Sequence, residues 1–224
     1  MKYLKKFKTM SEVQEWQSGN EHVIPNVVLV KDSGDVLYNL PALRDVMIQH
    51  IDGSLYTTDA WRTNGFTNDQ ANGVAVLGAN SKFVISKVEL GKWGWSSDTS
   101  NRIDGILTSD KTATAREDYA GATNTAIIAD DDTSGAALAC ANYTFPNGQK
   151  GYLPAAGQWG IAWAYKAEIT TAMQLIGGTA IGSGYYWSST QYSASYAWVI
   201  SWGGGGITYE SKYSLYFTRP FCAL

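Results

Sequence analysis

The stretch that decides the fold is the C-terminal one, residues 185–224, which reads YYWSSTQYSASYAWVISWGGGGITYESKYSLYFTRPFCAL. It holds eleven aromatic residues between Tyr185 and Phe217 and only two charged ones. So many rings with so little charge indicate segments that are buried or that contact another molecule. Four consecutive glycines, Gly203 to Gly206, permit a tight reversal, because glycine adopts positive φ without steric cost. The sequence therefore predicts two arms, one on each side of the glycines.

The first arm alternates with a period of two. On a strand, Trp198, Ile200 and Trp202 share one face. We expect this face to pack on the core. The other face is expected to point away from the core: Ala197, Val199, Ser201 and Gly203.

The second arm, residues 207–217, does not alternate. Tyr209, Tyr213 and Tyr216 stand among threonine, serine and leucine, whereas a strand that only has to pack alternates more regularly. Tyrosine, serine and glycine together are typical of an evolved binding surface. The residues alone leave two interpretations open, a binding surface or an irregular surface hairpin of a tyrosine-rich β protein.

Composition narrows the class of protein. The chain has 224 residues, of which 45% are hydrophobic and 17% charged, as in a folded protein. The net charge of -3 and the lack of a basic stripe argue against nucleic acid as a partner. No apolar run is long enough to span a membrane, and the first residues lack the apolar region of a secretory signal peptide.

Residues 1–54 are expected to form an N-terminal attachment module. A short helix is predicted at residues 12–17, followed by a hairpin of residues 27–30 and 36–38. Because a lone hairpin is marginal in water, this module needs a partner. The candidates are the main domain, another subunit, or a larger virion or surface assembly.

Residues 55–224 are expected to form an α+β main domain. Strands are predicted at residues 55–58, 74–77 and 83–89, and helical segments within residues 124–143, from residue 156, and around residues 169–176. Two apolar stripes on these helices are predicted core faces: Trp159, Ala162 and Trp163, then Ile169, Met173 and Ile176.

The sequence contains no recognisable catalytic or metal-binding motif. His22 and His50 have no acidic or thiol partner in a known pattern. The run from Asp130 to Asp132 is expected to cap a helix N-terminus, and a calcium site is the less favoured alternative. Cys140 and Cys222 are expected to be buried thiols, with a disulfide as the minority alternative. We therefore expect a non-enzymatic protein without cofactor or metal.

Four motifs carry a resemblance to a known family: GYLPAAGQW at 151–159, YWSSTQY at 186–192, AW at 197–198 and RPF at 219–221. They resemble the C-type-lectin-fold variable proteins of diversity-generating retroelements, in particular those of gut bacteria and their phages. That family shows G-Y-L-P-s-x-G-E-W, I-G-G at a helix end, Y-W-S-S-T, A-W, and a C-terminal R-P or R-A. Gln158 stands where glutamate is usual, and the resemblance covers roughly residues 55–224.

The resemblance implies a C-type-lectin-like domain, a fold shared with formylglycine-generating enzymes, and a hypervariable segment at residues 185–218. Nine positions would be fixed scaffold: Trp187, Trp198, Ile200, Trp202, Gly205, Ile207, Lys212, Phe217 and Arg219. Thirteen would be diversified and would bind the ligand: Tyr196, Val199, Ser201, Gly203, Gly204, Gly206, Thr208, Tyr209, Glu210, Ser211, Tyr213, Leu215 and Tyr216. Every residue type in the second set except glutamate is reachable from an AAC codon by changing adenines alone.

The calcium-dependent sugar lectins of this fold carry E-P-N or Q-P-D together with W-N-D, and none of these is present. The paired active-site cysteines of formylglycine-generating enzymes are not recognisable either, and a fold alone brings no activity. We expect a recognition protein whose macromolecular ligand is a protein or glycan on a bacterial surface. It would belong to a phage tail or a bacterial cell surface. A structural virion or surface assembly protein is the alternative, and an enzyme of the formylglycine-generating type comes third.

Overall fold

The computed structural model describes residues 28–30, 36–39, 45–130 and 132–224. The chain forms two units, residues 1–44 and 45–224. In the first unit, β1 (Val28–Val30) and β2 (Val36–Asn39) pair antiparallel, as the sequence predicts. The short helix expected at residues 12–17 lies outside the described residues.

The second unit begins ten residues earlier than the boundary expected at residues 54 and 55. Its first strand, β3 (Val46–His50), pairs with both β4 (Leu55–Tyr56) and β5 (Ala71–Leu77). Residues 46–49 are buried. The expected boundary would separate β3 from its own hairpin partner, so residues 45–54 belong to the main domain.

The first sheet of the main domain is antiparallel throughout and has the order β12-β6-β5-β3-β4. It includes β6 (Lys82–Ser86) and β12 (Phe221–Ala223). The rings of Phe83 and Phe221 stack with their centres 4.7 Å apart. The last strand of the chain is thereby fixed to this sheet by packing as well as by hydrogen bonds.

The second sheet is built mainly from the C-terminal stretch and has the order β10-β9-β8-β11-β7. Its strand pairs are antiparallel except for β8 with β11, which is parallel. Its strands are β7 (Lys92–Trp93), β8 (Tyr185–Gln191), β9 (Tyr196–Ser201), β10 (Ile207–Ser211) and β11 (Tyr216–Phe217). The main domain is thus a mixed α+β structure with two largely antiparallel sheets, which confirms the α+β expectation.

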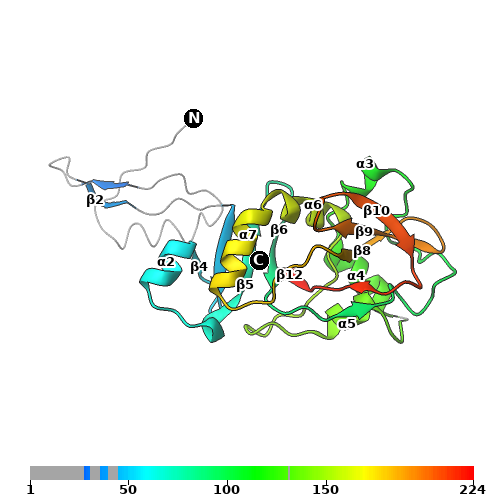
Figure 1. Cartoon of the computed structure of the whole chain (residues 1–224), viewed down its shortest axis with the longest axis horizontal. Helices are drawn as coiled ribbons and strands as arrows, with labels where there is room; N and C mark the ends of the chain where they lie inside the picture. The colour runs from blue at the N-terminus through cyan, green and yellow to red at the C-terminus, as the bar shows by residue number, and fades with distance from the viewer. Residues whose placement is uncertain (1–27, 31–35, 40–44, 131) are drawn as a thin grey trace. The chain divides into compact units, whose positions relative to one another are not determined.

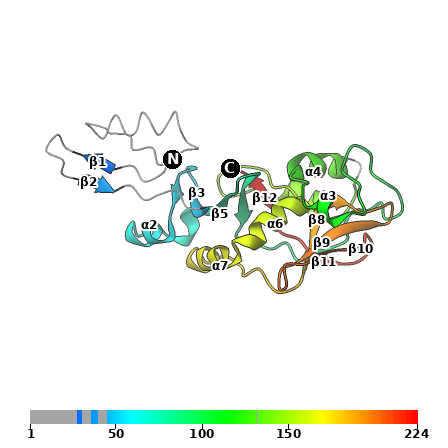
Figure 2. The same cartoon turned by 90° about the horizontal axis from the view of Figure 1, so that it is seen from above.

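Two consecutive helices connect the sheets (Figures 1 and 2). The helix α6 (Ala156–Ala164) contacts β8 and β9, and α7 (Lys166–Leu175) contacts β3 and β5. Trp159 of α6 lies at the centre of this core, 4.9 Å from the ring of Phe221. The other helices of the described residues are α2 (Thr58–Thr63), the 3-10 helix η1 (Asn68–Gln70), α3 (Thr112–Ala115), α4 (Gly121–Asp130) and α5 (Ala136–Asn142). Each helix in the described ranges is too short or too polar to cross a bilayer.

The strand β9 is buried on both faces, whereas the sequence predicts one core face. Ile200 and Trp202 pack in the core that contains Trp159. Ala197 and Val199, on the opposite face, are 0% exposed and pack in a second core. The prediction was wrong for this face because α4 and α5 supply a second apolar layer over the sheet, and their position is not readable from the strand itself.

The helix stripes are confirmed except at one position. Trp159, Ala162, Ile169, Met173 and Ile176 are all buried. Trp163, by contrast, is 37% exposed, and its indole N–H donates to the main-chain oxygen of Trp202 at 3.2 Å. This tryptophan supports the glycine turn instead of filling the core.

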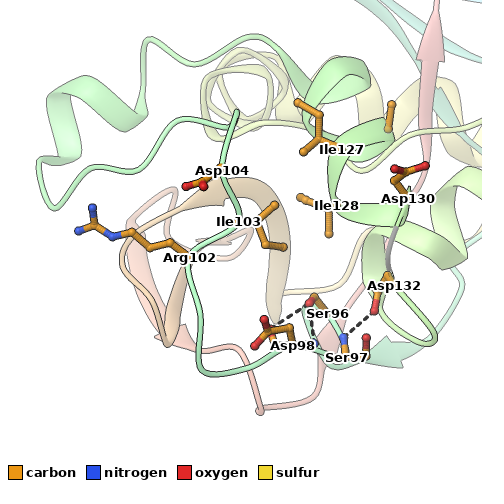
Figure 3. A pocket seen from close by; sticks show the side chains of 11 residues that line it. Ser96, Ser97, Asp98, Arg102, Ile103, Asp104, Ile127, Ile128, Asp130 and Asp132 are labelled. Carbon is orange, nitrogen blue, oxygen red and sulfur yellow. Dashed lines mark hydrogen bonds between the residues drawn. The ribbon is translucent and has the colours of Figure 1, made fainter.

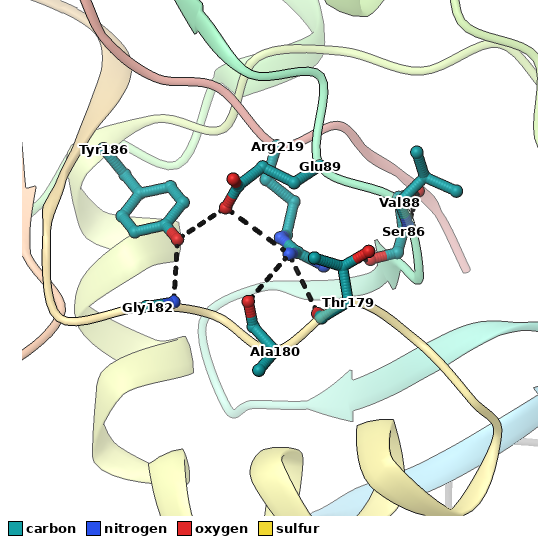
Figure 4. A network of polar contacts seen from close by, with 8 residues as sticks. All are labelled: Ser86, Val88, Glu89, Thr179, Ala180, Gly182, Tyr186 and Arg219. Atoms are coloured by element: carbon teal, nitrogen blue, oxygen red, sulfur yellow. Dashed lines mark hydrogen bonds and ion pairs between the residues drawn. The ribbon is translucent and has the colours of Figure 1, made fainter.

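A buried arginine lies where the chain passes from one sheet to the other (Figure 4). Arg219 connects β11 of the second sheet to β12 of the first and is 0% exposed. Its guanidinium donates to the main-chain oxygens of Ser86 at 2.9 Å and Thr179 at 3.0 Å, and lies 3.6 Å from the Glu89 carboxylate. The Tyr186 hydroxyl donates to that carboxylate at 2.7 Å. This network thus joins segments from three distant parts of the sequence, residues 86–89, residues 179–186 and Arg219.

We predict that Arg219→Met lowers the free energy of unfolding by about 3–5 kcal/mol, because it leaves a partly buried carboxylate and several carbonyls without their donor. The matched control is Arg62→Met, whose exposed ion pair with Asp59 spans 3.3 Å. That change should cost less than about 1 kcal/mol. Urea unfolding followed by circular dichroism measures both values, and equal costs would contradict the role assigned to Arg219.

Candidate ligand-binding surface

The predicted ligand-binding residues divide into three groups by exposure. Seven are exposed: Tyr196, Gly203, Gly204, Gly206, Tyr209, Tyr213 and Leu215. Five are half-buried: Ser201, Thr208, Glu210, Ser211 and Tyr216. One, Val199, is buried.

Val199 is therefore a correction to the predicted surface. It pairs with Trp187 across β8 and β9 and packs in the core below the sheet, where a ligand does not reach it. Tyr216, expected to be exposed, is instead half-buried, with its ring edge-on to Trp187 at 5.2 Å and to Tyr185 at 5.6 Å. The burial of both side chains depends on segments that are remote in sequence, so the pattern of residues around them does not predict it.

Three tyrosines gather where the turn between β8 and β9 meets the hairpin of β9 and β10, and we call them the tyrosine cluster: Tyr192, Tyr196 and Tyr209. Tyr192 and Tyr209 stack with ring centres 3.8 Å apart, and Tyr196 meets Tyr209 edge-on at 5.7 Å. Tyr196 is 42% and Tyr209 44% exposed. Apolar ring area with hydroxyl tips is the chemistry of a protein-binding hot spot.

Tyr192 is absent from the predicted ligand-binding set, although it lies in the hypervariable segment. It belongs to the turn after β8, and only the fold brings it over Tyr209. Desolvation, followed by the hydrogen bond with Tyr209, raises the pKa of the Tyr192 hydroxyl. The Tyr192 hydroxyl is therefore uncharged at neutral pH.

Two further side chains project beyond β10. Tyr213 is 81% and Leu215 62% exposed. They lie on a turn closed by the Ser214 N–H, which donates to the Ser211 oxygen at 2.8 Å. Exposure this large leaves both side chains available to a partner.

A buried lysine anchors this turn. Lys212 is 0% exposed, and its ammonium donates to Gln191 Oε1 at 2.7 Å and to the main-chain oxygen of Asn101 at 2.8 Å. It also lies 4.6 Å from the centre of the Trp95 ring. Burial lowers the pKa of this amine to about 8. The buried Lys212 is thus followed directly by the exposed Tyr213.

Of the four glycines in the turn between β9 and β10, the structure requires one to be glycine. Gly205 has φ of 70°, and a Cβ there would overlap the Trp163 ring. A Cβ at Gly206 would meet nothing within 4 Å, and one at Gly204 only the Ser201 hydroxyl at 3.8 Å. A Cβ at Gly203 would approach Ser183 at 3.1 Å. Among these glycines, backbone conformation and contact together require glycine only at Gly205.

A cavity of about 580 Å³ lies apart from the tyrosine cluster, between α4 and the loop of residues 96–104 (Figure 3). Its wall combines isoleucines with charged groups: Ile103, Ile127, Ile128, Asp98, Arg102, Asp104, Asp130 and Asp132. Within the described ranges, no three acidic, histidine or cysteine side chains are placed to share a metal ion.

The prediction that the acidic run caps a helix N-terminus was wrong for Asp130 and Asp132, the two of its residues that the structure describes. Asp130 is the last residue of α4, and Asp132 bonds instead to the loop that faces it. Its Oδ1 accepts from the Ser97 N–H at 2.6 Å. The α5 helix begins later, at Ala136, after Gly135. Cys140 and Cys222 are buried free thiols, as expected.

The fold of this chain is similar to that of a protein of known structure. No family model matches the chain, and no curated protein sequence matches it. A solved structure, described as a fimbrial protein from Bacteroides ovatus ATCC 8483, aligns with a TM-score of 0.61 at 12% identity. The alignment covers 82% of this chain and 49% of that one, so this chain spans about half the length of the fimbrial protein.

We predict that Gly205→Ala lowers the free energy of unfolding by about 1–3 kcal/mol, because an alanine there has unfavourable φ and meets the Trp163 ring. The matched control, Gly206→Ala, should change it by less than about 0.5 kcal/mol. Thermal unfolding of both variants measures the difference. A Gly206 variant as unstable as the Gly205 variant would show that the turn depends on its whole glycine run.

We also predict that Lys212 makes stability depend on pH. Because its folded-state pKa of about 8 lies below the ordinary lysine pKa of 10.5, the unfolded chain binds the proton more tightly. This contribution to stability therefore rises with pH between these values. The full effect is on the order of 3 kcal/mol.

The measurement is the difference in unfolding free energy between the wild type and Lys212→Met at pH 7 and at pH 9.5. Taking the difference removes the opposing effect of Cys140 and Cys222, whose pKa values burial raises in both proteins. The wild type should gain relative to the variant as pH rises. A pH-independent difference would contradict a buried, readily deprotonated amine.

Proposed function

We propose that this protein is a non-enzymatic recognition protein that displays a hypervariable ligand-binding surface on a C-type-lectin-like domain. In this proposal it is a variable protein of a diversity-generating retroelement. Its ligand is a macromolecule on a bacterial surface. The proposal extends the resemblance in four sequence motifs to the arrangement of the C-terminal segment.

The observation that carries the proposal is the difference in exposure between the positions assigned to the fixed scaffold and those assigned to variation. Of the nine positions assigned to the scaffold, none is exposed, and six are buried: Trp187, Trp198, Ile200, Trp202, Lys212 and Arg219. Of the thirteen assigned to variation, twelve are exposed or half-buried. A surface that changes while the fold persists needs this separation, since surface substitutions usually change stability little.

The glycine turn supports the same division independently of exposure. Gly205 is assigned to the scaffold and is the position where a side chain would meet both an unfavourable φ and the Trp163 ring. Gly204 and Gly206, assigned to variation, have room for a side chain. Variation at those two positions is therefore compatible with an unchanged turn.

The fold similarity bears on where the protein works. Its structural neighbour is described as a fimbrial protein, which favours a bacterial surface structure as a setting alongside a phage tail. It also favours the second candidate function, a structural subunit of a surface assembly. In either setting, residues 1–44 would be the attachment point. A reverse-transcriptase gene and a copy of the 3′ gene segment beside this gene would separate the two candidates.

We predict that replacing residues 196–218 with those of a differently diversified relative switches ligand specificity and leaves the fold unchanged. The parent and the graft are screened against protein and glycan fractions of host-cell surfaces, and circular dichroism verifies folding. The control graft exchanges only exposed residues of α7, which lie outside the predicted surface. If both folded proteins capture the same ligand equally well, recognition lies elsewhere on the chain.

A further inference from the structure

The strand β10 forms one outer edge of the second sheet. Among the strands that the structure describes, it pairs only with β9, in a continuous register from Ile207 opposite Ile200 to Ser211 opposite Tyr196. An outer strand keeps half of its main-chain N–H and C=O groups free of the sheet. These groups can bind a further strand if nothing covers them.

The register shows which groups are free. The Ser201 N–H donates to the Gly206 oxygen at 2.8 Å, and the Lys212 N–H donates to the Ser195 oxygen at 3.0 Å. Because bonds alternate along an antiparallel pair, the even-numbered residues of β10 face β9. The odd-numbered residues therefore face outward.

The outward groups lie at the middle of the proposed binding surface. Within the part of the chain that the structure describes, the N–H and C=O groups of Ile207 and Tyr209 have no hydrogen-bond partner. The Ser211 oxygen, by contrast, accepts from the Ser214 N–H. Four adjacent main-chain groups are thus open, directly beside the tyrosine cluster.

Other outer strands of the main domain are shorter or covered. β4 and β7 have two residues each. β12 is flanked by Tyr152, which exchanges two main-chain hydrogen bonds with Phe221 at 2.7 and 2.9 Å. β10 has five residues and contains no proline, lysine or register shift, which are the usual means of protecting an edge.

The side chains around this edge suit a polypeptide better than a glycan. Tyr192 covers one face of the Tyr209 ring at 3.8 Å, so this ring offers a sugar at most one face for stacking. An extended peptide needs only the main-chain edge and apolar contact beside it. Glu210 is the one charged side chain of β10, so a neutral or basic residue is favoured opposite it.

We propose that the ligand is a protein that adds an extended segment to β10 as a sixth strand. The segment pairs with the main chain of Ile207 and Tyr209, packs apolar side chains against the tyrosine cluster, and carries a neutral or basic residue opposite Glu210. This inference rests on the proposed function and specifies its ligand class. Main-chain pairing supplies affinity that persists when the variable side chains change, and those side chains select the partner.

The test uses a displayed library of linear decapeptides, from which peptides that bind the full chain are selected and synthesised. Dissociation constants are measured for the wild type, Tyr209→Ala and Tyr209→Pro. Alanine removes the ring alone, whereas proline also removes the outward N–H, and an outer strand tolerates proline at such a position. We expect Tyr209→Pro to bind at least about tenfold more weakly than Tyr209→Ala, equivalent to about 1.4 kcal/mol.

A second arm requires no protein variant. Single N-methyl groups are placed along the selected peptide, which removes one main-chain donor at a time. Strand addition predicts loss of binding at every second residue. Uniform tolerance of N-methylation, or equal binding by the folded alanine and proline variants, would overturn the proposal.

Two other results would assign the edge to a different occupant. If no peptide is selected, but a glycan array gives a ligand whose binding falls in Tyr196→Ala and Tyr209→Ala, strand addition is wrong and the proposed function stands. If sedimentation shows that the wild type dimerises and Tyr209→Pro does not, a second copy occupies the edge and the proposal is wrong. If neither library gives a ligand, both the proposed function and strand addition are rejected.

Discussion

The buried guanidinium of Arg219 ties the two sheets of the main domain together at the point where the chain passes from one to the other. It follows β11 of one sheet and precedes β12 of the other, and it donates to the carbonyl at the end of β6 and to one that follows α7. A buried cation is costly unless its hydrogen bonds and counter-charge are in place. Main-chain oxygens and the Glu89 carboxylate partner the two terminal nitrogens of Arg219, whereas its buried Nε has no hydrogen-bond partner within the described residues. This network, together with the pairing of β12 with β6, holds the last strand in place.

Buried polar side chains also stabilise the second sheet through hydrogen bonds to its neighbouring elements. The buried Asp118 carboxylate accepts from the Thr190 hydroxyl at 2.7 Å and from the Asn124 amide at 2.9 Å, which fixes α4 to β8. Lys212 and Gln191 do the same for the turn after β10. Since these bonds lie below the surface, they stabilise the sheet without involving the exposed side chains. In the proposed function, this separation is what allows the exposed residues to vary.

The sequence predicted the local elements better than their surroundings. The β9 strand, the glycine reversal and the apolar stripe of α7 were readable because each follows from a short-range pattern. Val199, Trp163 and Tyr216 were misplaced because their exposure depends on elements that are remote in sequence. The same reason explains β3, whose membership in the main domain is decided by β5 and not by its own residues.

The sequence by itself determined the α+β class, the aromatic C-terminal stretch, the turn at Gly203 to Gly206 and the lack of a recognisable catalytic motif. These follow from residue type and spacing, which act over a few residues. Tertiary structure alone decided that β9 is covered on both faces, that Tyr192 stacks on Tyr209, and that the outer edge of β10 is open. Burial and strand order depend on which distant segments meet, and no local pattern of side chains encodes that meeting.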